Sequence, residues 1–191
     1  MAETDWPQLL NAIEACQRCA LHQGIRKKVP GQGNLQAKLM LVGEGPGQEE
    51  DRQGLAFVGP AGQLLTRMLA SIGLSRDDVY IANVVKCRPP GNRVPAPEEV
   101  ACCLPFLRAQ YALIRPRVML VLGATALKAL VNPGAGITSS RGKWVVRQGL
   151  WMLPTYHPAA LLRDPAKKRE SWDDLQLVRD KLAELEENPH A

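Results

Sequence analysis

The chain has 191 residues, 46% hydrophobic and 23% charged, with a net charge of +5 and a pI near 9.1. These values are typical of an ordinary globular protein, and the absence of an apolar run of about 18 residues argues against a membrane span. The positive charge permits a polyanionic partner without requiring one. Because the beginning, MAETDWPQLL, lacks an export-signal pattern, we expect a cytoplasmic monomer with a single domain over residues 1–191.

Helical and strand patterns alternate along the chain. Their order predicts an α/β fold of three layers, with helices on both faces of a central four-stranded parallel sheet. The expected helices cover residues 5–19, 61–74, 97–114, a segment from about Thr125, and roughly 171–187. The expected strands cover residues 39–44, 79–86, 118–124 and 150–158.

Polar loops rich in Gly or Pro follow three of the four expected strands. Glu44 stands in GEGPG after the first strand, Asn83 begins a polar stretch at the end of the second, and His157 precedes Pro158 after the fourth. The carboxyl ends of parallel strands meet at one edge of a sheet, and ligands bind there. The three loops should therefore converge on one cleft.

Five cysteines occur, which are Cys16, Cys19, Cys87, Cys102 and Cys103. A C-x-x-C pair in a reducing compartment indicates metal or redox chemistry more often than a disulfide. Four thiolates favour an all-sulfur site, which is either an iron–sulfur cluster or zinc. The alternative is a set of buried free cysteines that pack as small apolar side chains.

The helical phase of residues 97–114 bears on the adjacent pair. Cys103 falls on the apolar stripe three residues after Val100, whereas Cys102 lies about a third of a turn away. A ligand must face the same interior as Cys87, so the phase favours Cys103 as the fourth ligand.

Four motifs occur in a recognisable order: GEGPGQEED (43–51), FVGPAGQLL (57–65), NVVKCRPPGNR (83–93) and YHPAALLR (156–163). Together with the cysteine spacing they closely resemble the family 4 uracil-DNA glycosylases, which carry a 4Fe–4S cluster. The resemblance covers the chain from Cys16 to about Leu185.

The resemblance implies a base-excision repair enzyme that hydrolyses the N-glycosidic bond of uracil in single- and double-stranded DNA and leaves an abasic site. In the family the last cysteine directly precedes an x-P-F-L segment, which Cys103 does here. The implied cluster ligands are Cys16, Cys19, Cys87 and Cys103, with Cys102 as a bystander. A sister group forms covalent adducts through a histidine in an R-R-I-H insert. Residues 88–93 contain no histidine, so covalent trapping is not expected.

The motifs also imply roles for the side chains at the strand ends. Glu44 positions or activates the water, and His157 donates to uracil O2 as negative charge develops on the leaving base. Asn83 pairs with the O4 and N3–H edge of uracil, which cytosine does not match. Phe57 stacks on the flipped base, and Gly45 lets the backbone approach it closely. The alternatives are a solvated Glu, a turn-forming Asn, a core Phe and a structural His.

The remaining expected roles are the exclusion of thymine and contact with DNA. Glu50 is expected near uracil C5. Leu161 and Leu162 form a candidate apolar wedge, for which the alternative is simply the start of a helix. The side chains expected to contact the DNA backbone are Lys86, Arg88, Asn92, Arg93 and Arg163.

Two other functions remain open on sequence grounds. One is a non-catalytic iron–sulfur module that binds DNA or senses redox state. The other is a hydrolase with a zinc-tetrathiolate site that acts on another nucleotide. The combination of Glu44, Asn83 and His157 argues against a pure binding module, because binding alone does not need these three groups.

Overall fold

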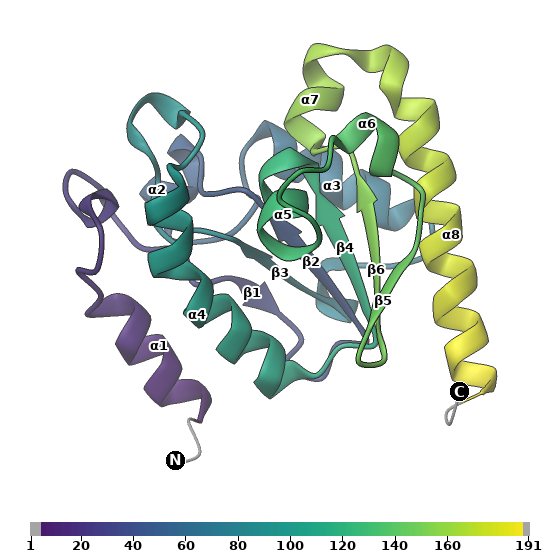
Figure 1. The fold of residues 1–191 in the computed structure, drawn as a ribbon, viewed down its shortest axis with the longest axis horizontal. Helices are drawn as coiled ribbons and strands as arrows, with labels where there is room; N and C mark the ends of the chain where they lie inside the picture. The colour runs from purple at the N-terminus through teal and green to yellow at the C-terminus, as the bar shows by residue number, and fades with distance from the viewer. Residues whose placement is uncertain (1–4, 189–191) are drawn as a thin grey trace.

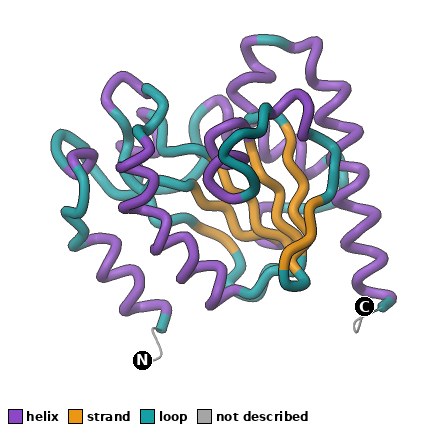
Figure 2. The backbone as a smooth tube through the Cα atoms, in the orientation of Figure 1, coloured by secondary structure: helices purple, strands orange, loops and turns teal. Residues whose placement is uncertain are grey.

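The computed structural model describes residues 5–188, in which one six-stranded sheet lies between two layers of helices (Figures 1 and 2). The strands, in the spatial order β1-β3-β2-β4-β6-β5, are β1 (Gln32–Gly33), β2 (Leu39–Gly43), β3 (Val79–Asn83), β4 (Val118–Leu122), β5 (Val145–Arg147) and β6 (Leu150–Thr155).

The four middle strands, β3, β2, β4 and β6, pair in parallel, and the short outer strands β1 and β5 pair antiparallel. The expected α/β class is therefore confirmed, but the sheet is wider than the four strands expected. The two outer strands have only two and three residues, which is too short for an alternating apolar pattern to reveal them.

In the part of the chain that the structure describes, eight α-helices connect or flank the strands: α1 (Trp6–Glu14), α2 (Gln48–Gln53), α3 (Pro60–Ala70), α4 (Pro97–Ile114), α5 (Gly123–Leu130), α6 (Ile137–Ser140), α7 (Pro158–Arg163) and α8 (Lys168–Glu187). Short 3₁₀ turns join them, which are η1 (Ala20–His22), η2 (Arg76–Asp78), η3 (Pro90–Asn92) and η4 (Pro165–Lys167).

The strands β2, β3 and β4 bury both of their faces, which explains their continuous apolar sequences. Along β2, Met40 and Val42 face the layer of α1, α4 and α5, whereas Leu39 and Leu41 face the layer of α3, α7 and α8. In Figure 1 the first layer lies in front of the sheet, and α3 lies behind it. The side-chain alternation of a strand thus divides the core into two halves.

Several expected boundaries differ from the structure. The helix expected over residues 5–19 ends at Glu14, so Cys16 lies beyond it. The strand expected over 79–86 ends at Asn83, and the one expected over 150–158 ends at Thr155. In each case the predicted segment includes loop residues that line a cavity. Some of these residues are apolar because they are buried, and their sequence therefore resembles that of a helix or strand.

The order of the strands reverses at the middle of the sheet. The chain passes from β2 to β3 on one side and then returns to β4 on the other side of β2. In parallel sheets such a reversal opens a crevice at the carboxyl ends of the two strands involved. None of the helices within residues 5–188 is long and apolar enough to cross a membrane.

Candidate active site and sulfur-lined cavity

A cleft of about 640 Å³ opens at the carboxyl ends of β2, β3, β4 and β6. This volume lies within the range of small-molecule sites, about 300–1,000 Å³. The three expected loops do converge here. Of the side chains expected to bind uracil or DNA, the cleft is lined by Glu44, Gly45, Glu50, Phe57, Asn83, Asn92, Arg93, His157, Leu162 and Arg163.

Glu44 directly follows β2 and faces across the reversal point toward α5. The hydroxyl of Thr125 donates a hydrogen bond to Glu44 Oε2. Thr125 lies in the first turn of α5, directly after the end of β4. The contact holds one carboxylate oxygen and leaves the other available to a ligand.

Asn83 ends β3 beside Gly43, its register partner at the end of β2. Its side chain is 1% exposed, and Oδ1 is buried without a hydrogen-bond partner. A buried acceptor without a donor costs free energy unless a ligand supplies the donor. This orphaned oxygen therefore indicates a ligand that carries an N–H or O–H group.

Gly43 lets two side chains close over the end of the sheet. A Cβ on Gly43 would lie 2.5 Å from the Phe57 ring and 2.6 Å from Asn83 Oδ1. Gly45, two residues on, is similarly close to Val85, where a Cβ would lie 2.8 Å from Cγ2. The absence of a side chain at Gly43 leaves room for both the Phe57 ring and the Asn83 amide at the end of the sheet.

Phe57 and His157 lie on either side of the strand ends and approach each other. Their ring centroids are 5.5 Å apart with an interplanar angle of 31°. Phe57 is 5% exposed and packs with residues of the α3 side of the core, so its ring is both a core residue and a cleft residue. The two alternatives posed by the sequence for Phe57 are thus compatible.

His157 caps α7, where its Nδ1 accepts a hydrogen bond from the Ala159 backbone N–H at 3.1 Å. A neutral ring that accepts at Nδ1 carries its proton on Nε2. Burial, and to a lesser degree the positive charge of Arg163, lowers the pKa of His157 to about 4. The ring is therefore a neutral Nε2–H donor near pH 7.

Glu50 lines the cleft, but both of its oxygens are engaged. Oε1 accepts hydrogen bonds from the Val58 and Gly59 backbone N–H groups at 2.8 Å each, and Oε2 accepts one from Gly47 at 3.1 Å. The carboxylate thus braces two loops of the site. These bonds leave it poorly suited to the expected role of excluding thymine.

Two side chains expected at the DNA surface are buried instead. Leu161 is 1% exposed and packs in the core on the α3 side. Lys86 is also 1% exposed, and its Nζ donates to the Asn83 carbonyl at 2.9 Å and to Gln110 Oε1 at 2.6 Å. Both expectations were wrong, because the period of α7 turns Leu161 inward and a buried amide stabilises the lysine beneath the strand end.

The other expected DNA contacts remain at the rim of the cleft. Leu162 is 42% exposed, and Arg163 is exposed beside it. Arg88 donates to Asn92 Oδ1 at 2.7 Å, which ties the two residues together in the loop after β3. Arg93 forms a bidentate ion pair with Glu99, with distances of 2.8 and 2.7 Å, so its charge is already partly balanced.

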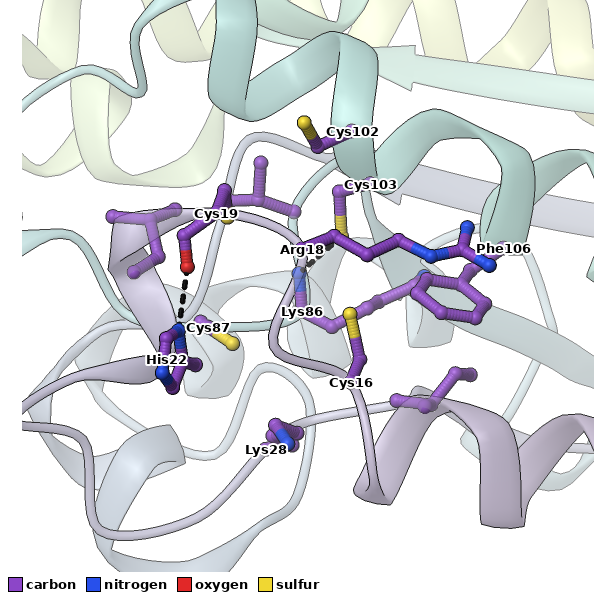
Figure 3. Close-up of a pocket in the computed structure, with 13 residues that line it drawn as sticks. Cys16, Arg18, Cys19, His22, Lys28, Lys86, Cys87, Cys102, Cys103 and Phe106 are labelled. Carbon is purple, nitrogen blue, oxygen red and sulfur yellow. Dashed lines mark hydrogen bonds between the residues drawn. The ribbon is translucent and has the colours of Figure 1, made fainter.

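A second, smaller cavity lies between α1, the loop after β3 and α4, and all five cysteines line it (Figure 3). Its remaining lining includes the apolar side chains of Ile13, Leu21, Val85 and Phe106. Within residues 5–188, no three His, Cys, Asp or Glu side chains form a group tight enough to hold a single metal ion. The cavity nevertheless brings together thiols from three distant parts of the chain.

The thiols interact electrostatically as well. Burial, and to a lesser degree the neighbouring thiols of Cys103, Cys19 and Cys16, raise the pKa of Cys87 to about 12. Such crowding disfavours free thiolates and suits a site in which a cation or a cluster replaces the protons.

Cys102 and Cys103 differ in their surroundings. Cys103 is 8% exposed, and its Sγ accepts a hydrogen bond from the Lys86 backbone N–H at 3.2 Å. Cys102 is only partly buried, and in Figure 3 its sulfur is directed away from the space that the Cys16 and Cys103 sulfurs face. Phe106, three residues after Cys103 in α4, is buried in the same core cluster as Cys103.

Sequence reasoning missed one residue of the cleft that contacts an expected catalytic group. Thr125 was treated only as the beginning of a helix, although it follows the one strand end to which no polar residue had been assigned. The sequence GAT after VMLVL could have identified it, because this strand ends at the same edge as the other three.

Comparisons with known proteins complete these observations. The model of the uracil DNA glycosylase superfamily matches residues 30–176. A type-4 uracil-DNA glycosylase of Thermotoga maritima is 49% identical over 156 residues, covering 80% of each chain. Proteins of the same name from Pyrobaculum aerophilum (43% identical; 91% of this chain and 92% of the relative) and Archaeoglobus fulgidus (44%; 89% of each) are similar over greater lengths.

Proposed function

This chain belongs to the type-4 branch of the uracil DNA glycosylase superfamily, and we infer from that membership that it is an enzyme that excises uracil from DNA. The single observation that best supports this activity at the described cleft is the buried, unpaired side-chain oxygen of Asn83. Its buried Oδ1 lacks a donor, and uracil N3–H is a donor of the kind it needs. We propose further that the enzyme acts on both single- and double-stranded DNA.

Asn83 would read the edge of the flipped base. When Oδ1 accepts the uracil N3–H, the side-chain NH₂ group of Asn83 can donate to O4. Cytosine has an unprotonated N3 and an amino group at position 4, so both contacts would be mismatched. Phe57 would support the plane of the base, since its ring and the Asn83 side chain both lie beside Gly43 in the cleft.

Glu44 and His157 would share the chemistry. As the C1′–N1 bond breaks, its electron pair moves onto the uracil ring, where the Nε2–H of neutral His157 donates to O2. The oxygen of a water molecule bonds to C1′, and the proton it loses passes to Glu44. The bond from Thr125 supports this role, because it orients the carboxylate while one oxygen remains available.

The sulfur-lined cavity would hold a 4Fe–4S cluster through Cys16, Cys19, Cys87 and Cys103. The donor set fits this group, since four thiols line one cavity with apolar walls and one of them already accepts a backbone N–H bond. When bound, the cluster supplies cross-linking rather than reaction chemistry. It would join the segment after α1 to the loop after β3, and so help to position Asn83 and Asn92.

DNA would lie across the rim of the cleft. Leu162 is the exposed apolar side chain available to fill the space that the flipped base leaves, and Arg163 next to it would contact phosphate. Arg88, Asn92 and Arg93 would contact the backbone from the loop after β3.

The direct test is uracil release from a labelled single-stranded oligonucleotide with one uracil, followed by hot alkali to break abasic sites. We expect cleavage at the uracil and none in a thymine control, and the same result on a duplex. Glu44→Gln should lower the rate by about 10²–10⁴-fold, the usual contribution of a general base, while DNA affinity persists. No cleavage by an iron-loaded wild-type protein would instead support the non-catalytic binding module.

A further inference from the structure

Phe57 has a backbone conformation that its surroundings must maintain. Its φ is 53°, in the left-handed region that residues with a side chain seldom occupy. Such a residue persists only where neighbouring contacts hold it. The first turn of α3 lies directly against it, since a Cβ on Gly62 would be 1.8 Å from the Phe57 carbonyl oxygen.

Arg76, in the η2 turn before β3, binds this segment through its carbonyl groups. Nη1 donates to the Phe57 carbonyl oxygen at 3.0 Å, and Nη2 donates to the Ala56 carbonyl oxygen at 2.7 Å. Gln32 is a second donor to Ala56, at 3.2 Å. Among residues 5–188, Arg76 is the side chain that donates to the Phe57 carbonyl.

Glu50 binds the same segment from its amide groups. It accepts from the next two backbone N–H groups, those of Val58 and Gly59. Residues 56–59 are therefore held by a guanidinium at two carbonyls and by a carboxylate at two N–H groups. Arg76 is half-buried and lies outside the set of residues that line the cleft.

We propose that Arg76 is a positioning residue for base recognition, which fixes the Phe57 ring in the cleft by holding the Ala56 and Phe57 carbonyl groups. The planar guanidinium suits this task, because it presents two N–H donors in a rigid fork. A lysine at this position offers a single ammonium group and cannot reproduce both bonds in the same geometry. The inference rests on the proposed function, in which Phe57 stacks on the flipped base.

The position of the ring can be measured without any substrate. The chain has two phenylalanines, Phe57 and Phe106, so protein labelled with fluorophenylalanine should give two ¹⁹F signals, assigned with Phe57→Leu. Arg76→Met should shift or broaden the Phe57 signal and leave the Phe106 signal in place, with Arg76→Lys intermediate. An unchanged Phe57 signal in folded Arg76→Met protein would overturn the proposal.

Recognition of the base is measured separately from binding of the DNA backbone. The inhibition constant of free uracil should rise about tenfold in Arg76→Met, within the range for loss of one base–aromatic stack. The affinity for an oligonucleotide with an abasic site, which has no base to stack, should be unchanged. Equal losses of both affinities would reduce Arg76 to general structural support and so contradict the proposal.

Arg67→Met is the matched control. Arg67 is an exposed arginine of α3 and forms no ion pair or side-chain hydrogen bond among the described residues. The Arg67→Met variant should have the same two ¹⁹F signals as the wild type, and the same affinities for free uracil and for the abasic-site oligonucleotide. If wild-type protein releases no uracil, the proposed function fails, but the ¹⁹F spectra still decide whether Arg76 positions Phe57. If Arg76→Met does not fold, Arg76→Lys serves for both measurements.

Discussion

The surroundings of His157 determine both its tautomer and its charge. The Ala159 N–H occupies Nδ1, and burial together with Arg163 disfavours the cation. The tautomer and the charge suitable for donation to a leaving base are thus present before substrate binds. This arrangement follows from the position of His157 as the residue that caps α7.

The first prediction concerns the titration of His157. NMR signals of its ring should shift with a midpoint near pH 4, because burial lowers the pKa to about that value from 6.5. Between these two pH values the unfolded chain takes up a proton that the folded chain does not. The free energy of unfolding should therefore fall as the pH drops through this window, relative to His157→Gln. A midpoint near 6.5 would show that the ring is solvated.

The second prediction concerns Thr125. Thr125→Val removes the hydroxyl that donates to Glu44, and should lower kcat by about tenfold, the low end of the effect of a hydrogen bond to a charged group. Thr125→Ser keeps the hydroxyl and should retain the wild-type kcat. Steady-state uracil release at saturating DNA gives kcat for both variants. A wild-type rate in Thr125→Val would mean that Glu44 does not need this contact.

At the scale of elements, the sulfur-lined cavity connects parts of the fold that the sheet does not. The chain after α1, the loop after β3 and the α4 helix meet there, and α1 itself packs against α4. The loop after β3 also contributes Asn92 and Arg93 to the cleft. Loss of the proposed cluster should therefore disturb both stability and the rim of the active site.

The third prediction compares two cysteines of this cavity. Cys87→Ala should lose the iron and the visible absorbance together, and its Tm should fall by about 10 °C, which corresponds to a few kcal/mol in a chain of this size. Cys102→Ala is the matched control and should retain both. The iron content and the Tm of the two variants and the wild type are compared. Full stability of Cys87→Ala without iron would refute the structural role of the cluster, and zinc in place of iron would refute its identity.

At the scale of the whole molecule, the net charge of +5 matters only through its distribution. Lys86 is buried, and Arg93 is paired with Glu99, so neither presents a full charge to DNA. Arg163 is exposed at the mouth of the cleft and has no ion pair among residues 5–188. A count of basic residues therefore overstates the charge that faces the substrate.

The fourth prediction follows from this distribution. Arg163→Gln should reduce the slope of log K against log salt concentration by about 0.9, as expected for one lost phosphate contact. Arg93→Gln should change it less, because Glu99 already balances much of that charge. Binding of an abasic-site duplex, measured over a series of salt concentrations, gives both slopes. Equal reductions would show that the Arg93–Glu99 pair opens on DNA.

The sequence by itself determined the α/β class, the middle strands and the family, because apolar runs, glycine-rich turns and motif order are local properties of the chain. It also placed Glu44, Asn83 and His157 at one edge, since parallel strands end there together. Only the tertiary structure decided that Lys86 and Leu161 are buried, that Glu50 braces two loops, and that Thr125 and Arg76 contact cleft residues. The contacts of Lys86, Thr125 and Arg76 are hydrogen bonds between residues far apart in the chain, and the burial of Leu161 depends on what α7 packs against, so local patterns do not encode them.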